Sequence, residues 1–405
     1  MSNQVEHILE YLSKERDDSG LPWWKAQVDL AMQELSAHCT DDYQQSHIIE
    51  AFDKIADADS IDEKSFREAL DHVRSSKEQK ESATWKIFVP VQVDLNDDLA
   101  ERPSLKVQDQ TFSFCEASFV DQSLPVDLSD PTEFWSATRC TDWPAPEVYV
   151  TSEVEASSWQ DAWRVLEPAF DVFKGFAEFR YSLGHRRWGG DGPRANLPHP
   201  KYYIAFDGNE TVQGTTFVVS EHEVTQPIEI TEDYIEDLKN ESDGLKKVPD
   251  ESSVDSLIVD ALRLYSQAMD ERFKEGRFLG FWQMLETVAL SGRVNGKTSK
   301  IRSRVAWHGD RLGLPGTGIR KRLDKLADKR NDLVHRGIRN ASDDDTNVLK
   351  LIAETAVDWL QSEREELSTK HHLDLYYQFR TTGNSSLDKT QDVLTLIKAN
   401  RRACT

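Results

Sequence analysis

The chain has 405 residues, of which 38% are hydrophobic, including 17 Phe and 11 Trp. This length exceeds what one typical hydrophobic core needs, so we expect two or three domains. No run of residues approaches the roughly 18 apolar positions of a membrane span, which argues against an integral membrane protein. The formal net charge of −23 argues against nucleic-acid contact over most of the surface, because Lys and Arg bind phosphate groups.

The four cysteines are scattered and show no spacing typical of a metal site. Free thiols fit a reducing cytoplasm, and the first residues lack the apolar centre of a signal peptide. We therefore expect a soluble cytoplasmic protein that needs no metal or other cofactor and has no membrane partner. The acidic composition is also typical of organisms with a salty cytoplasm, and the sequence leaves that alternative open.

Residues 1–80 are predicted to form a helical N-terminal segment. The stretch SIDEKSFREALDHVRSS begins with a capping-box pattern, in which Ser60 precedes Glu63 by three positions. The apolar residues that follow fall on one face of the predicted helix: Phe66, Leu70 and Val73.

Residues 84–238 are predicted to form a mixed α/β domain of unknown role. Short alternating runs indicate strands, among them TWKIFVPVQVDL, SLKVQDQTFSFCEASFV, PEVYVTSEVEA, KYYIAFDG and TTFVVSEHEV. A helix is predicted near 158–183, and the polar run at 239–253 is the predicted linker. We expect this β-rich middle domain to be a sensor or specificity module for an unknown ligand or trigger.

Residues 254–366 are predicted to form a helical domain, and 367–405 a helical tail. One long helix is expected around SLIVDALRLYSQAMDERFKEGRFLGFWQMLETVAL. A basic connection follows, and then helices in GIRKRLDKLADKRNDLVH and DTNVLKLIAETAVDWLQSE. The fold class is therefore predicted to be α+β, with a helical N-terminal segment, a mixed β-rich middle domain and an all-α C-terminal bundle.

One segment departs from the acidic character of the chain. Residues 293–339 contain 14 Lys and Arg against 4 Asp and Glu, a local balance of +10 that leaves −33 for the remainder. A cationic surface of this kind attracts a phosphate polymer. Four of its residues surround the motif described next and are predicted to bind RNA: Lys325, Lys329, Arg336 and Arg339.

The stretch KLADKRNDLVHRGI combines Arg330, Asn331 and His335. The Arg–His spacing alone is a weak signal, since the same spacing occurs elsewhere in the chain, for example in Arg67–His72 and Arg180–His185. Arg330 differs because it occupies a slot on an apolar helix seam, where a charge is costly unless it has a partner. Asn331 and His335 are four positions apart and share a helix face. An ordinary surface histidine on a basic helix is the alternative interpretation. The seam consists of Ile319, Leu323, Leu326, Arg330, Leu333 and Gly337.

This motif, preceded by FLGFWQMLETVAL and followed by LKLIAETAVDWL, resembles the HEPN superfamily, most closely its Apea-like branch. The resemblance covers roughly residues 255–365 and rests on an Arg-x4-6-His motif in which Asn often follows the Arg directly. It implies a helical bundle that forms a homodimer and places two motifs across a shared cleft. It also implies a metal-independent endoribonuclease of the kind found in antiviral defence and toxin systems. HEPN modules that bind RNA or nucleotides, or regulate a partner protein, without cleaving RNA are the alternative.

The residue types suit RNA cleavage without a metal ion. The ribose 2′-OH then acts as an internal nucleophile, and the reaction needs a general base and a general acid. Histidine, with an ordinary pKa of about 6.5, can perform either role near neutral pH, so His335 is the candidate for proton transfer. Arg330 is the candidate to stabilise the negative charge of the transition state. Asn331 is the candidate to orient His335 or the phosphate.

Overall fold

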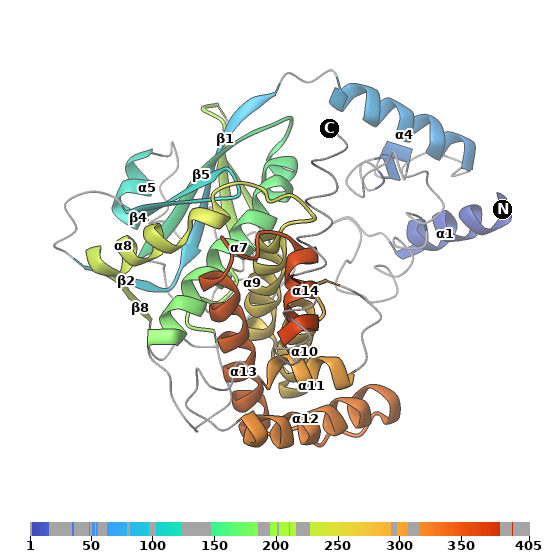
Figure 1. The fold of residues 1–405 in the computed structure, drawn as a ribbon. Coiled ribbons are helices and arrows are strands. Elements are labelled where there is room, and N and C mark those ends of the chain that lie inside the picture. Colours follow the sequence, from blue (N-terminus) through green and yellow to red (C-terminus); the bar gives the residue numbers. More distant parts are fainter. Residues whose placement is uncertain are drawn as a thin grey trace, which may run out of the picture. The chain divides into compact units, whose positions relative to one another are not determined.

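The structure is a computed structural model (Figure 1). Apart from a few isolated positions, it describes residues 2–15, 63–78, 82–96, 103–123, 147–184, 195–200, 202–209, 211–215, 227–292, 298–306 and 316–380. The chain divides into two compact units. One comprises Met1–Thr84 with Glu155–Ala162, and the other comprises Trp85–Val154 with Trp163–Thr405.

The first unit buries a small apolar core between its helices. Helix α1 (Ser2–Glu15) contacts helix α4 (Glu63–Glu78). The predicted apolar face of α4 consists of Phe66, Leu70 and Val73. These side chains are buried in a cluster with residues of α1. The predicted capping-box residue Ser60 lies outside the described residues.

The second unit contains a six-stranded sheet in the order β3-β4-β5-β1-β6-β7. Its strands are β1 (Ala83–Val91), β3 (Ser104–Val107), β4 (Gln110–Glu116), β5 (Val148–Ala156), β6 (Tyr202–Phe206) and β7 (Thr211–Thr215). The pairs β1–β6, β3–β4, β4–β5 and β6–β7 are antiparallel. A smaller sheet pairs β2 (Val93–Leu95) in parallel with β8 (Ile228–Ile230).

Strands β1 to β6 follow the predicted runs, whereas β7 shares only Thr215 with one of them and β8 was not predicted. The end of the second predicted run, ASFV, forms the start of helix α5 (Ala117–Ser123) instead of a strand. Most of the run TTFVVSEHEV lies outside the described residues.

The segment predicted as a linker is partly bound to the larger sheet. Helix α8 (Glu232–Glu241) enters it and a short 3-10 helix, Asp243–Leu245, follows. The turn between β3 and β4 donates backbone N–H groups to this segment: Gln108 bonds the carbonyl oxygen of Leu245 at 2.6 Å, and Asp109 bonds that of Lys246 at 2.8 Å. Because both donors belong to a tight turn, these bonds fix the segment against the strand ends.

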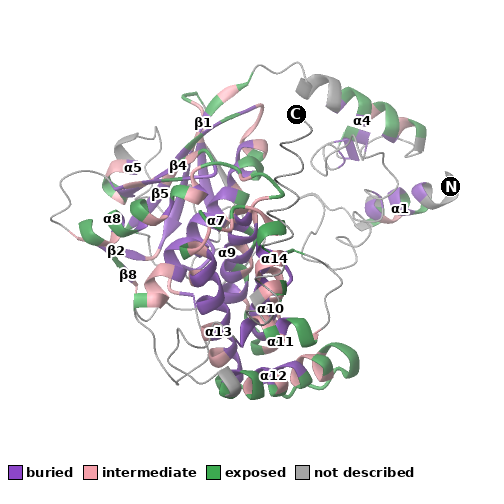
Figure 2. Cartoon of the chain, viewed as in Figure 1, coloured by how far each residue is buried: buried purple, intermediate pink, exposed green. Residues whose placement is uncertain are grey.

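Most of the other described residues of the second unit are helical. These helices are α7 (Trp159–Gly184), α9 (Val254–Asp270), α10 (Lys274–Ala289), α11 (Thr298–Val305), α12 (Gly316–Arg336), α13 (Asp343–Ser362) and α14 (Lys370–Arg380). Buried residues are concentrated along α7, α9, α10 and α13, whereas α12 is largely exposed or half-buried (Figure 2).

The single long helix predicted from about 256 to 290 is wrong, because two helices occupy this stretch. Glu271 leaves the helical conformation with φ −61° and ψ 125°, and its Oε1 accepts the backbone N–H of Phe273 at 3.1 Å. Helices α9 and α10 then pack against each other. Gly280 permits this packing, since a Cβ there would lie 2.7 Å from the Cβ of Ala268.

Helix α7 also packs closely against α9. A Cβ added at Gly175 would overlap the carbonyl oxygen of Leu262. The sheet-bearing segment and the C-terminal helices therefore share one unit. The predicted α+β class is confirmed to the extent of an antiparallel sheet and a helical C-terminal region. In the described part of the chain, no helix has both the length and the hydrophobicity that a membrane crossing requires.

Candidate functional site

Helix α12 carries the predicted motif on its less buried half. Its first half is anchored by Ile319, Leu323 and Leu326, which are all buried. Farther along the same seam, Leu333 is only half-buried and Gly337 is exposed. The apolar seam predicted from the sequence is therefore present, and it emerges from the protein toward the end of the helix.

The end of α12 is fixed by a glycine. Gly337 has φ +66°, a conformation that favours glycine. Its N–H bonds the carbonyl oxygen of Leu333 at 3.2 Å, and the N–H of Ile338 bonds that of Asp332 at 3.1 Å. The bond from Gly337 to Leu333 is that of an αL cap, which ends the helix at Arg336 and leaves His335 in its last turn.

Arg330 has the counter-charge that its place on the seam requires. Its Nη2 lies 3.8 Å from Oε1 of Glu286 on α10. The same carboxylate oxygen accepts the indole N–H of Trp282 at 2.7 Å, which holds it in place. Arg330 also donates from Nη1 to Oδ1 of Asn331 at 3.5 Å, so these two motif residues are in contact.

His335 is exposed, as is Asn331 one turn earlier on the same side of the helix. Among the described residues, His335 has no hydrogen-bond or ion-pair partner. Two large apolar side chains flank it at high exposure, Val334 at 48% and Ile338 at 45%. A single chain therefore brings Arg330 and Asn331 together and leaves His335 open to solvent.

The four predicted RNA-binding residues differ in their surroundings. Lys329 forms an ion pair with Asp345, a buried carboxylate of the capping box that begins α13. Arg336 pairs with Asp332, with 3.0 Å between Nη1 and Oδ1. Lys325 and Arg339 are exposed and have no ion-pair partner among the described residues. Two of the four positive charges are thus balanced within the chain.

The pKa of Asp345 shows how firmly Lys329 is engaged. Burial raises this pKa, but the hydrogen bonds from Lys329 and Ser342 more than offset burial, so the pKa lies below its ordinary value. Lys329 therefore stabilises the start of α13, whatever else it binds.

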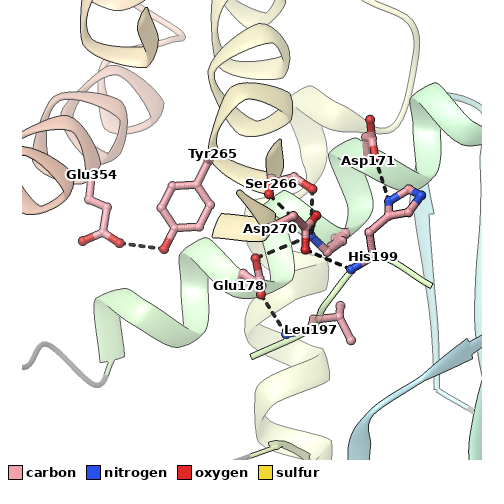
Figure 3. Close-up of polar contacts among 9 residues, drawn as sticks. Asp171, Glu178, Leu197, His199, Tyr265, Ser266, Asp270 and Glu354 are labelled. Carbon is pink, nitrogen blue, oxygen red and sulfur yellow. Dashed lines mark hydrogen bonds and ion pairs between the residues drawn. The ribbon is translucent and has the colours of Figure 1, made fainter. Parts of the chain in front are cut away.

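A second group of polar residues, which the sequence did not predict, is buried between α7, α9 and residues 195–200 (Figure 3). Lys174 of α7 forms an ion pair with Asp270 of α9, and its Nζ lies 4.0 Å from Oε2 of Glu178. The carboxylates also hold the neighbouring backbone: Glu178 accepts the N–H of Leu197 at 2.7 Å, and Asp270 accepts that of His199 at 2.9 Å.

Burial shifts the pKa values in this cluster in opposite directions. Burial raises the pKa of Glu178 to about 7, although the Lys174 ammonium lowers it in part. Burial lowers the pKa of His199 to about 4, and Lys174 adds to that effect. For Lys174 itself burial lowers the pKa, but Asp270 and Glu178 raise it by more. At neutral pH we therefore expect a charged Lys174 and a neutral His199.

Across the described ranges, no group of three or more His, Cys, Asp or Glu side chains could hold a metal ion. Comparison with known proteins finds no matching family model, no similar curated protein and no similar solved structure.

Proposed function

We propose that the protein is a cytoplasmic, metal-independent endoribonuclease of HEPN type that cleaves RNA at the exposed end of α12. The observation that carries this proposal is the arrangement of three side chains there. Arg330 is held by Glu286 and touches Asn331, while His335 lies open to a substrate. These groups supply a positioned positive charge, a polar orienting group and a proton carrier.

The proposed reaction uses the ribose 2′-OH as nucleophile. One histidine takes the 2′-OH proton, the 2′-oxygen attacks phosphorus, and Arg330 stabilises the added negative charge. The bond from phosphorus to the 5′-oxygen then breaks, and a second acid protonates that oxygen. The products are a 2′,3′-cyclic phosphate and a 5′-OH. His335 of a second copy supplies the second proton carrier in a homodimer.

The test is incubation of the purified full chain with RNA in EDTA. Cleavage that persists in the chelator supports the proposal, and an absolute need for a divalent metal contradicts it. The second candidate function is a module that binds RNA or nucleotide, or regulates a partner, without cleavage. It is favoured by the carboxylates that already balance Arg330, Lys329 and Arg336 within the chain. Binding without cleavage would select it.

Lys325→Glu with Arg339→Glu is expected to weaken RNA binding. Both side chains are exposed and unpaired in the described part of the chain, so reversing them alters little else. Each lost phosphate contact should reduce the slope of log affinity against log salt by about 0.7 for single-stranded RNA, or about 1.4 for the pair. The slope is measured by titrating labelled RNA at several salt concentrations.

The matched control reverses two exposed lysines elsewhere, Lys239→Glu with Lys247→Glu, and thus changes the net charge equally. Equal loss in both double variants would contradict α12 as the docking surface. Lys329 is left intact, because its replacement would strand the buried carboxylate of Asp345.

Val334→Asp with Ile338→Asp is expected to convert a dimer into a monomer. These exposed apolar side chains flank His335. In a dimer with a two-fold axis, each copy would cover the Val334 and Ile338 side chains of the other. Light scattering of the full chain at tens of micromolar measures the mass. The full chain is needed because α9 packs against α7. The control is Val248→Asp, at a 67% exposed valine outside α12. A wild-type monomer would contradict the dimer.

A further inference from the structure

A pocket of about 610 Å³ lies on the second unit, at the outer end of the buried polar cluster. This volume is typical of sites for small molecules. Residues of α7, α9 and the segment before β6 form its wall, and none of them belongs to the motif on α12. Its lining includes the charged or titratable side chains Glu167, Asp171, His199, Arg263 and Asp270.

The pocket wall has more negative than positive charge available. Asp270 is already paired with Lys174. Arg263 is also engaged, since it donates to the carbonyl oxygen of Pro168 at 3.3 Å and to Oε1 of Gln108 at 3.0 Å. Glu167 and Asp171 lie one turn apart on α7. Among the described residues, neither has a Lys or Arg within salt-bridge distance.

Asp171 is the more buried of these two carboxylates. Its Oδ1 lies 3.7 Å from Nδ1 of His199 (Figure 3), but His199 is neutral near pH 7 and supplies no positive charge. Burial raises the pKa of Asp171 to about 6; the Lys174 ammonium opposes this shift, and the Glu167 carboxylate adds to it. Burial also raises the pKa of Glu167. A positive group in the pocket would therefore favour both ionised carboxylates.

We propose that this pocket binds a small organic cation, whose ammonium or guanidinium group lies between Asp171 and Glu167. Hydrogen bonds from a charged donor to two carboxylates are strong and directional. A multidentate metal site is a poorer fit, because the described residues provide no group of three suitable ligands. Arg272 also lines the pocket, near the Phe273 ring. The site is independent of the proposed ribonuclease activity, and its test uses no RNA.

The test is calorimetry with the full chain at low salt and pH 8. The probes are putrescine and agmatine, and 1,4-butanediol is the uncharged comparator of putrescine. Both cations should bind with one site per chain, whereas the diol should not. Asp171→Asn and Glu167→Gln should each weaken binding by about tenfold or more, the usual scale for a lost hydrogen bond to a charged group.

A chain of net charge −23 attracts any cation weakly, so the control is Glu236→Gln on the exposed face of α8. This variant should keep the wild-type affinity. Equal weakening in Glu236→Gln and Asp171→Asn would indicate diffuse attraction and overturn the proposal. Absence of saturable one-site binding by both cations at millimolar concentration would also overturn it.

The pH dependence of cation binding can be measured in the unmodified protein, so this test does not depend on whether a variant folds. Ionised Asp171 is the binding form, so affinity should fall as pH is lowered from 8 through about 6 to 5. Binding near pH 6 should also release protons, seen as different heats in buffers of different ionisation enthalpy. An affinity that does not change between pH 8 and pH 5 would contradict the role of Asp171.

Discussion

His335→Ala is expected to reduce RNA cleavage by at least about a hundredfold, the lower end of what general acid–base catalysis contributes. Arg330→Ala should cause a loss of about the same size, since one lost charge-stabilising donor costs about 10²- to 10³-fold. RNA binding should persist in both, because exposed cations outside the motif remain. Asn331→Ala should have a smaller effect, because an orienting amide transfers no proton.

The measurement is a time course of cleavage of a labelled RNA in EDTA, with analysis of the product ends. Products should carry a 2′,3′-cyclic phosphate, which the internal nucleophile leaves behind. The matched control is His371→Ala, which removes an exposed histidine on α14. It should cleave at the wild-type rate. If His335→Ala also cleaves at that rate, His335 transfers no proton and the non-cleaving function replaces the proposed one.

Glu286 allows a finer test of how Arg330 is positioned. The structure shows that Glu286 balances Arg330 and is itself held by Trp282. Glu286→Gln removes the charge and keeps a hydrogen-bond acceptor, so its cleavage defect should be smaller than that of Arg330→Ala. The position of Arg330 on the apolar seam predicted a counter-charge, and Glu286 is that counter-charge.

The sequence predicted α12 well because its apolar seam has a clear helical period. Ile319, Leu323 and Leu326 are buried in that register, and Arg330 falls where the seam begins to emerge. The identity of Glu286 could not be predicted, since it lies on another helix more than forty positions away. The pairing of Lys329 with Asp345 was also missed, because a charged residue on a basic helix gives no sign of its partner on another helix.

The break between α9 and α10 was missed because the sequence there lacks proline and glycine. Residues 270–273 are Asp-Glu-Arg-Phe, which do not oppose a helix strongly. The break depends on the hydrogen bond from the backbone N–H of Phe273 to the Glu271 side chain, and on the packing of the two helices against each other. A stretch of 35 residues is longer than most single globular helices, and this length was the available warning.

The buried cluster on α7 did leave a signal in the sequence. Lys174 and Glu178 lie four positions apart within the run FDVFKGFAEF, which is otherwise apolar except for Asp171, and they are flanked by phenylalanines that are buried. Charges surrounded by such residues must be paired if the helix is buried. Their partners Asp270 and His199 come from segments far along the chain, so topology was needed to identify them.

Lys174→Met is expected to lower the free energy of unfolding by about 3–5 kcal/mol, the usual effect of removing one partner of a buried ion pair. The ammonium is fully buried, and its loss leaves Asp270 facing Glu178 across the α7–α9 contact without a compensating charge. Chemical denaturation of the full chain measures the change. The control is Lys246→Met, which breaks an exposed pair with Asp243 and should have little effect.

Adding Asp270→Asn to Lys174→Met should restore part of the stability, because it removes the uncompensated charge. The defect of Lys174→Met should also be smaller at pH 5 than at pH 8. Without Lys174 the pKa of Glu178 rises above about 7, and an acid with a raised pKa favours the folded state most at low pH. The pKa of His199 moves back toward its ordinary value, which lessens the loss of stability on acidification. An unchanged denaturation midpoint in Lys174→Met would mean that apolar packing alone holds α7 against α9.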